Sequence, residues 1–197
     1  AGTKIIGLGR GNDRPTFSWT VAAGTVLMNV ANVLFKNMIF VMDTGTVTAT
    51  VADGIIVSAA GCEVSNCRIR AGTDANSNTT IAVRTTAAGD DFTFADNFCH
   101  QVAITAEGTT FLRAVGADRL RVTGNYINYA ADTAAVGPVQ FLTTASTDVI
   151  IANNFIWSSK AASTACIAGG LAGCTGTIRD NRLRNELNTS MAHIVVT

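Results

Sequence analysis

The titratable side chains that could carry acid–base chemistry gather in one short stretch of the sequence. Asp90 and Asp91 are adjacent, Asp96 follows them closely, and His100 comes shortly after. Paired carboxylates serve as the acid and the base of glycoside hydrolysis, and a nearby histidine can transfer a proton. If the chain is an enzyme, these four residues are its predicted catalytic group.

Other features of the sequence argue against catalysis at these residues. Asp90 and Asp91 follow Gly89 in a TTAAGDD turn, and neighbouring residues of a strand point to opposite faces. The best partners for Asp96 would be Asp180 or Asp148, but Gly124 and Asn153 occupy the equivalent positions between Asp96 and Asp180. The carboxylates are therefore interrupted by neutral residues. The sequence favours a non-enzymatic role and leaves the enzyme alternative open.

Metal and cofactor motifs are not found in the sequence. The five cysteines include no paired CxxC spacing, so we predict no metal site and expect reduced, partly buried thiols. The glycine-rich residues 7–11 resemble a phosphate loop, but the stretch Asn12-Asp13-Arg14-Pro15 that follows disfavours the helix that such a loop requires. We predict a turn there and no cofactor.

Arginines and aromatic residues form the other candidate site. Each of three arginine pairs flanks one apolar residue, so both arginines of a pair would point outwards: Arg68 and Arg70, Arg119 and Arg121, Arg182 and Arg184. Outward arginines could bind an acidic glycan, contact a neighbouring subunit, or form ion pairs within the chain with acids such as Asp118 or Asp180. Tyr126 and Trp157 fall near equivalent positions and are the one indication of an aromatic strip.

The overall charge and hydropathy exclude some partners. The chain has 14 basic and 14 acidic side chains, and charged residues make up only 14% of the sequence. This balance offers no strong attraction to nucleic acid or to anionic membranes. Apolar residues occur in short runs, well below the roughly 18 consecutive ones of a membrane-spanning helix. We therefore predict no nucleic-acid partner and no membrane insertion.

The elements that position these residues repeat along the chain. Six segments share an apolar-x-apolar-x-polar core followed by more apolar residues: VLFKNMIF at 33–40, CEVSNCRI at 62–69, FTFADNFC at 92–99, LRVTGNYI at 120–127, VIIANNFI at 149–156 and GTIRDNRL at 176–183. Their polar corners are spaced by 27 to 30 residues. A second apolar patch precedes each segment, as in residues 55–57 and 81–83, and a last one is found at residues 193–196. Each repeat therefore carries at least two short strands.

Short strands at this spacing, with no helical pattern between them, predict an all-β fold. The best fit is a right-handed single-stranded parallel β-helix, with about seven rungs of 27 to 30 residues. Residues 1–197 would form one such domain, or a fragment of a longer chain. Equivalent inward residues would then stack from rung to rung, as in the set Phe35, Val64, Phe94, Val122, Ile151 and Ile178.

The polar corners are predicted to be structural. Asn, Asp and Gly tolerate the left-handed backbone that a tight bend requires, and stacked Asn side chains can hydrogen-bond along the rungs. Gly124 occupies one corner. The predicted turn ladder contains Asn37, Asn66, Asp96, Asn97, Asn125, Asn153, Asn154, Asp180 and Asn181.

The opening TKIIGLGRGNDRPTF at residues 3–17, followed by rungs with an apolar-x-apolar-x-polar-Asn turn, resembles the pectin-lyase-like β-helix superfamily. It is also similar to the β-helix modules of bacteriophage virion proteins such as tailspikes, tail fibres and capsid decoration proteins. The rung pattern covers nearly the whole chain. The resemblance implies the fold, but the superfamily includes lyases, hydrolases, adhesins and structural proteins.

Together, the residues and the resemblance predict a non-enzymatic structural or surface module of a phage virion, serving assembly or host-surface attachment. The expected location is the virion surface. The expected partners are further copies of the chain, as a homotrimer, and other virion proteins, with bacterial surface glycan as a further candidate. The alternative is a polysaccharide lyase or glycosidase that acts on such a glycan.

Overall fold

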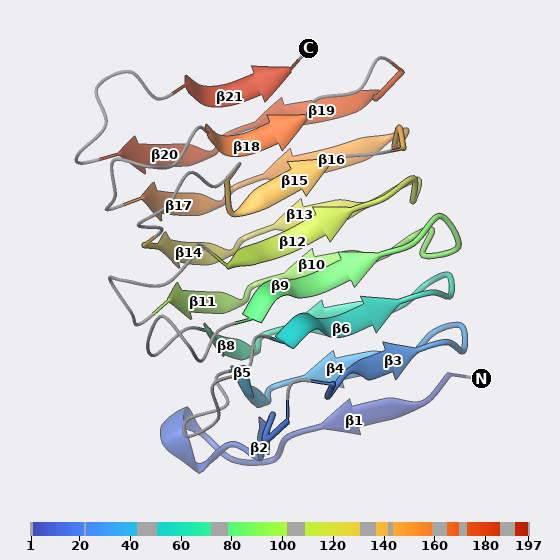
Figure 1. Ribbon diagram of the computed structural model, residues 1–197, viewed down its shortest axis with the longest axis vertical. Helices are drawn as coiled ribbons and strands as arrows, with labels where there is room; N and C mark the ends of the chain where they lie inside the picture. The colour runs from blue at the N-terminus through green and yellow to red at the C-terminus, as the bar shows by residue number, and fades with distance from the viewer. Residues whose placement is uncertain are drawn as a thin grey trace.

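The protein is a parallel β-solenoid in a computed structural model that describes residues 2–21, 23–42, 51–71, 79–101, 109–130, 137–141, 144–158, 165–169, 173–185 and 192–196. Three parallel sheets of seven strands each run along it, and the chain passes through one strand of each sheet in succession. Figure 1 shows these strands stacked one above another from the N-terminal to the C-terminal end. The one helical element in the described ranges is the short 3-10 helix η1 (Gly11–Asp13).

Every third strand belongs to the same sheet. Sheet A contains β1 (Lys4–Ile6), β4 (Leu34–Lys36), β7 (Glu63–Ser65), β10 (Thr93–Ala95), β13 (Arg121–Thr123), β16 (Val149–Ala152) and β19 (Gly176–Arg179). Sheet B contains β2 (Thr16–Ser18), β5 (Ile39–Met42), β8 (Arg68–Ala71), β11 (Phe98–Gln101), β14 (Tyr126–Tyr129), β17 (Phe155–Ser158) and β20 (Arg182–Asn185). Sheet C contains β3 (Val26–Met28), β6 (Val51–Val57), β9 (Thr79–Thr85), β12 (Thr110–Ala114), β15 (Val139–Phe141), β18 (Ala165–Gly169) and β21 (Ala192–Val196).

The core lies between the three sheets and is built from stacked equivalent residues. The predicted inward set on sheet A is confirmed, because the strand register pairs its members in order: Phe35, Val64, Phe94, Val122, Ile151 and Ile178. Phe94 and Val122 in the middle of this set are almost completely inaccessible to solvent. Burying a side chain of this size contributes about 1.5–3 kcal/mol. The repeat thus positions one apolar column from end to end.

The bend from sheet A to sheet B uses a left-handed residue at every predicted corner. The backbone angle φ lies between 49° and 67° at Asn37, Asn66, Asp96, Gly124, Asn153 and Asp180. L-residues other than Asn and Asp rarely adopt this conformation, and glycine adopts it freely. The residue types at these corners therefore follow from the backbone that the bend requires.

The residue after each of the last four corners forms the predicted asparagine ladder. Asn125 is buried, and its Nδ2 donates to the carbonyl oxygen of Phe94 at 2.9 Å and to Oδ1 of Asn154 at 2.9 Å. Its own Oδ1 accepts hydrogen bonds from the backbone N and the Nδ2 of Asn97. Asn154 repeats the pattern with Asn181. The side chains thus satisfy backbone groups that the bends leave without a sheet partner.

The bend from sheet C to sheet A has its own left-handed column, which the sequence pattern did not predict. This column consists of Asn32, Gly61, Asp91, Arg119 and Asp148, all of which have a positive φ. Asp90 and Asp118 precede two of them, and their carboxylates accept hydrogen bonds from the backbone N of the next rung, at Asp118 and Thr147 respectively. Aspartate side chains therefore stabilise this corner much as asparagines stabilise the other.

None of the five cysteines is in a disulfide, and all but Cys174 are buried. Burial raises the pKa of the Cys99 thiol well above its ordinary value and that of Cys166 to about 11. The burial expected for these thiols is thus partial at Cys174 and complete at the other four positions. They pack as small apolar side chains.

Candidate functional site

The outer face of sheet B brings most of the predicted arginine and aromatic residues together. Side chains alternate along each of its strands, so that on β8 Ile69 points into the core while Arg68 and Arg70 point outwards. The parallel register then places the first outward residue of each strand in one column. From β8 to β20 this column consists of Arg68, Phe98, Tyr126, Phe155 and Arg182.

The three aromatic rings of this column are stacked face to face. The ring centroids of Phe98 and Tyr126 are 5.1 Å apart with an interplanar angle of 8°, and those of Tyr126 and Phe155 are 5.1 Å apart at 22°. The guanidinium of Arg68 lies 5.8 Å from the Phe98 centroid, and that of Arg182 lies 5.4 Å from the Phe155 centroid. We call these five residues the arginine–aromatic column. An arginine closes each of its ends through a cation–π contact.

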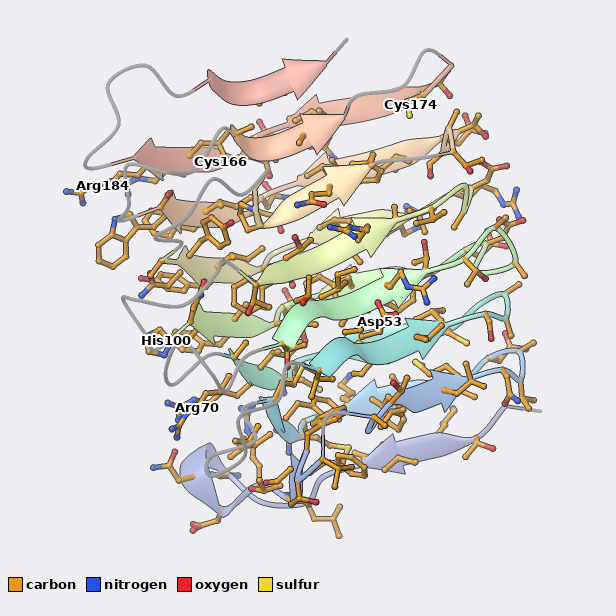
Figure 2. The ribbon with its side chains drawn as sticks, viewed as in Figure 1. Asp53, Arg70, His100, Cys166, Cys174 and Arg184 are labelled. Atoms are coloured by element: carbon orange, nitrogen blue, oxygen red, sulfur yellow. The ribbon has the colours of Figure 1, made fainter. Side chains whose placement is uncertain are left out.

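A second outward column runs beside it along the same strands. It contains Arg70, His100, Asn128, Trp157 and Arg184. Figure 2 shows Arg70, His100 and Arg184 projecting from the same side of the solenoid. The pKa of His100 is lowered from its ordinary value by burial first, and then by the positive charges of Arg68 and Arg70. His100 is therefore held in its neutral form, as expected for an imidazole beside guanidinium groups.

The charges of the solenoid are distributed unevenly. The described strands of sheet B contain four arginines and no acidic residue. On sheet C, by contrast, Arg84 binds Asp53 through two hydrogen bonds of 2.9 Å each. Other acids lie at the corners, among them Asp118 and Asp148. The described strands of sheet B thus present arginine as their one kind of charged side chain, in a chain whose formal net charge is zero.

The predicted catalytic pair Asp90 and Asp91 lies at the corner before β10. Arg119 in the next rung donates from Nε and Nη2 to the two oxygens of Asp91, at 2.7 and 3.0 Å, and its Nη2 also lies 3.4 Å from Oδ2 of Asp90. The Arg119 hydrogen bonds lower the pKa of Asp91 below its ordinary value. Both carboxylates thus contact Arg119. Asp91 stays ionised, whereas a general acid needs a raised pKa.

The other two predicted catalytic residues lie elsewhere. Asp96 is at the opposite end of β10 from Asp91, which is about 16 Å for an extended segment of this length. His100 belongs to the next strand, β11, in sheet B. The structure therefore does not gather the four residues around one point. The structure also places Arg119 away from the outer face of sheet B, at the corner before β13. Arg121 lies on the outer face of sheet A.

Part of the aromatic column on sheet B is not apparent from the sequence pattern. The register pairs Tyr126 with Phe155 and Asn128 with Trp157, so Trp157 lies one column away from Tyr126 instead of stacking on it. Phe98 and Phe155 were hidden within apolar runs, where a phenylalanine is normally assigned to the core. Aligning the corners Asp96, Gly124 and Asn153 would have revealed them, because each aromatic residue comes two positions after its corner.

Comparison of the chain with known protein families, with curated proteins and with solved structures finds no match. Within the described ranges, no three His, Cys, Asp or Glu side chains form a cluster that could hold a metal ion. The same ranges contain no helix that is long and apolar enough to cross a membrane.

The arginine–aromatic column can act as a contact surface, and its geometry limits how. Phe98 and Tyr126 are 42% and 37% exposed. Each ring face in the column is covered by a neighbouring ring or by an arginine. The column therefore presents to solvent a row of ring edges, the Tyr126 hydroxyl and two guanidinium groups. It therefore has no open aromatic face on which a sugar ring or a base could stack. Contacts with ring edges and charged hydrogen bonds to arginine are available.

Proposed function

We propose that the chain is a non-enzymatic structural and surface-presenting module, a right-handed parallel β-helix of about seven rungs that serves assembly or surface attachment. Parallel strands of one sheet that are joined by a crossover connect with a right-handed sense in nearly all proteins, which supports the right-handed winding. The seven strands in each sheet support the rung number. A place in a phage virion, as a fibre, spike or decoration component, is the role that the rung pattern resembles.

The observation that carries the non-enzymatic role is the commitment of the candidate acids to structural contacts. Asp91 is bound by Arg119, Asp90 accepts a backbone hydrogen bond from Asp118, and Asp96 lies at the far end of β10. Glycosidases need two carboxylates within about 10 Å of each other across a bound substrate, one of them with a raised pKa. Asp90 and Asp91 are close to each other, but the pKa of Asp91 is shifted in the opposite direction.

The two ends of the solenoid support a role in assembly. Inward-facing residues of the first and last strands are exposed there, including Ile5 and Phe17 at one end and Ile178 and Ile194 at the other. Their strands also have hydrogen-bonding edges without a partner strand in the described sheets. Both features are buried when further β-structure, of this chain or of a neighbouring subunit, continues the stack.

Turnover of glycan tests the proposed function directly. The purified protein is incubated with capsular polysaccharide and lipopolysaccharide, and reducing ends and unsaturated products are measured over time. We expect no product above that of a heat-treated sample. Product release that is lost in Asp91→Asn but retained in Asp53→Asn would establish the glycosidase or lyase alternative, because Asp53 lies on sheet C away from the candidate pair.

Association is tested separately by light scattering of the native protein after size-exclusion chromatography. A homotrimer is the expected species. A monomer at all concentrations would contradict the homotrimer, and attachment as a single subunit would then remain as the proposed role.

A further inference from the structure

A cationic groove lies beside the N-terminal end of the arginine–aromatic column. Its first hollow, about 460 Å³, is lined by the glycine-rich turn together with the side chains of Arg10, Arg14 and Lys36. A second hollow, about 340 Å³, is lined by Arg14, Arg68 and Phe98, with Gly11 and Asn12. Arg14 and Gly11 line both hollows, so the two are adjacent. We call them together the Arg14 groove.

The groove is positively charged. Four basic side chains line it, and no Asp or Glu is among its lining residues in the described part of the chain. Asp13, the nearest acid in sequence, is exposed and lines neither hollow. The Nε of Arg14 is buried and has no hydrogen-bond acceptor among the described residues. An anion bound here would offset a concentration of positive charge that no acidic lining residue compensates in the described part of the chain.

The walls of the Arg14 groove are held in place by hydrogen bonds. Asn37 Nδ2 donates to the carbonyl oxygens of Gly7 and Gly9, at 2.6 and 2.9 Å. Arg14 Nη1 donates to the carbonyl oxygen of Asn66 at 2.9 Å, and Arg68 Nη1 donates to Oδ1 of Asn12 at 3.0 Å. These bonds attach the turn to two later corners of the solenoid. A site built this way loses little conformational entropy when it binds a ligand.

The glycines of the turn are needed for this close packing. A Cβ at position 7 would lie 2.1 Å from the carbonyl oxygen of Asn37, and one at position 9 would lie 1.9 Å from that of Asp13. Gly11 has a φ of 56°, which a side chain would strain. The glycines that make this turn resemble a phosphate loop are thus required by the close approach of the backbone to Asn37 and Asp13. The positive charge of the groove comes from the basic residues that line it and not from a helix N-terminus.

The shape and charge of the groove indicate the chemical class of the ligand. Three basic side chains around one hollow suit a group with three terminal oxygens, such as a sulfate or phosphate ester, better than a carboxylate with two. The second hollow, with Arg68 and the edge of Phe98, extends the site to a neighbouring unit of the same ligand. Both faces of the Phe98 ring are covered, by Tyr126 and by Arg68, which disfavours the base stacking typical of single-stranded nucleic acid.

We propose that the Arg14 groove binds an oligosaccharide that carries sulfate or phosphate esters. The esters bind at Arg10, Arg14 and Lys36, and the next sugar lies against Arg68 and Phe98. The inference deepens the proposed function, because it names a ligand for surface attachment without turnover.

Binding is measured by isothermal titration calorimetry of the full chain with heparin hexasaccharide and with a phosphorylated pentamannose, which separate the two ester types. Maltohexaose is the neutral control, oligogalacturonate the carboxylate control, and a single-stranded oligothymidylate the nucleic-acid control. We expect binding of at least one ester-bearing glycan that weakens with added salt, weaker binding of oligogalacturonate and none of maltohexaose. Tighter binding of oligothymidylate than of both ester-bearing glycans would overturn the proposal.

Matched variants locate the site. Arg10→Gln with Lys36→Gln removes two charges from exposed side chains of the groove, and Arg121→Gln with Arg179→Gln removes two from exposed side chains on sheet A. We expect the first pair to weaken binding at least about tenfold and the second to change it by less than about twofold. Equal weakening by both pairs would overturn the site. If the Arg10→Gln, Lys36→Gln variant does not fold, the site is tested in the unmodified protein by NMR. The amide chemical shifts of Gly9 and Gly11 must then change when the ester-bearing glycan is added, and unchanged shifts would overturn the site.

The two proposals fail in different ways. Release of glycan products would refute the non-enzymatic role and leave binding in the Arg14 groove intact. Absence of both binding and product release would refute the groove alone.

Discussion

Asparagine has different roles at two consecutive positions of the same corner. Asn153 occupies the left-handed position, where its side chain is exposed and the backbone conformation decides the choice of residue. Asn154, the next residue, is buried, and its amide makes hydrogen bonds to both neighbouring rungs, to Asn125 and Val122 in one and to Asn181 in the other. A left-handed corner accepts Gly or Asp equally well, as at Gly124 and Asp96. The ladder position needs both a donor and an acceptor, so only an amide side chain of this length completes it.

Replacement of Asn125 by alanine tests the ladder. The change leaves the backbone N of Asn97 and the carbonyl oxygen of Phe94 buried without their partners. We expect the free energy of unfolding to fall by about 2–4 kcal/mol. Chemical denaturation followed by circular dichroism measures the change. Asn181→Ala is the comparison, because Asn181 is only partly buried, and a loss there as large as at Asn125 would contradict the ladder's cooperativity.

The neutral state of His100 predicts a pH dependence of stability. The pKa of His100 is lower in the folded protein than in the unfolded chain, where it is about 6.5. Between the two values the unfolded chain binds more protons, so stability is fully present above about pH 6.5 and falls as the pH is lowered through this window. The carboxylates of Asp91 and Asp118 also have lowered pKa values, but they lose their contribution only at more acidic pH.

The measurement is the free energy of unfolding by urea at several pH values between about 5 and 7.5, a range chosen around the ordinary pKa of histidine. The neutral variant His100→Gln should flatten the dependence in this range. An unchanged slope in the variant would show that His100 is not the group responsible.

At the scale of the strands, the sequence predicts the inward residues that recur in every rung. It does not predict the outward contacts that depend on how neighbouring strands are aligned. The inward column through Phe94 and Val122 could be predicted because apolar residues recur at a constant spacing and only the core requires them. The outward column could not be assigned in the same way, since it combines three aromatic residues with an arginine at each end and has no residue type common to every rung. Arg119 shows the same limit, because it lies at a left-handed corner that is typical of Asn or Gly.

Tyr126, the middle ring of the arginine–aromatic column, tests what this outer surface contributes to the strands beneath it. Tyr126→Ala removes two stacked contacts, with Phe98 and with Phe155, each worth about 0.5–1.5 kcal/mol. We therefore expect a loss of about 1–3 kcal/mol in the free energy of unfolding. Tyr126→Phe keeps the ring and should be nearly neutral. Thermal and urea unfolding of the two variants compare them, and equal losses would assign the effect to the hydroxyl and not to stacking.

At the scale of the whole molecule, we expect the middle of the solenoid to be more stable than its ends. Each central strand is paired on both sides, whereas β1, β2, β3, β19, β20 and β21 are paired on one side only within the described sheets. Phe94 and Val122 are buried in the middle, and the equivalent Ile5 and Ile178 at the ends are exposed. Because stability in a repeat array is a sum of nearest-neighbour contacts, the end strands have lost about half of theirs.

Hydrogen exchange measured by mass spectrometry on the native protein tests this gradient. We expect amides of β9 to β14 to exchange slowest and those of the six end strands to exchange fastest, because opening an end strand breaks only one strand pairing. Exchange also separates the isolated solenoid from an assembled one, since subunits that stack end to end would protect β1 and β19 as strongly as the middle. Protection of one end only would indicate that a partner covers that end. Uniformly fast exchange along the whole chain would contradict a solenoid held together by its central rungs.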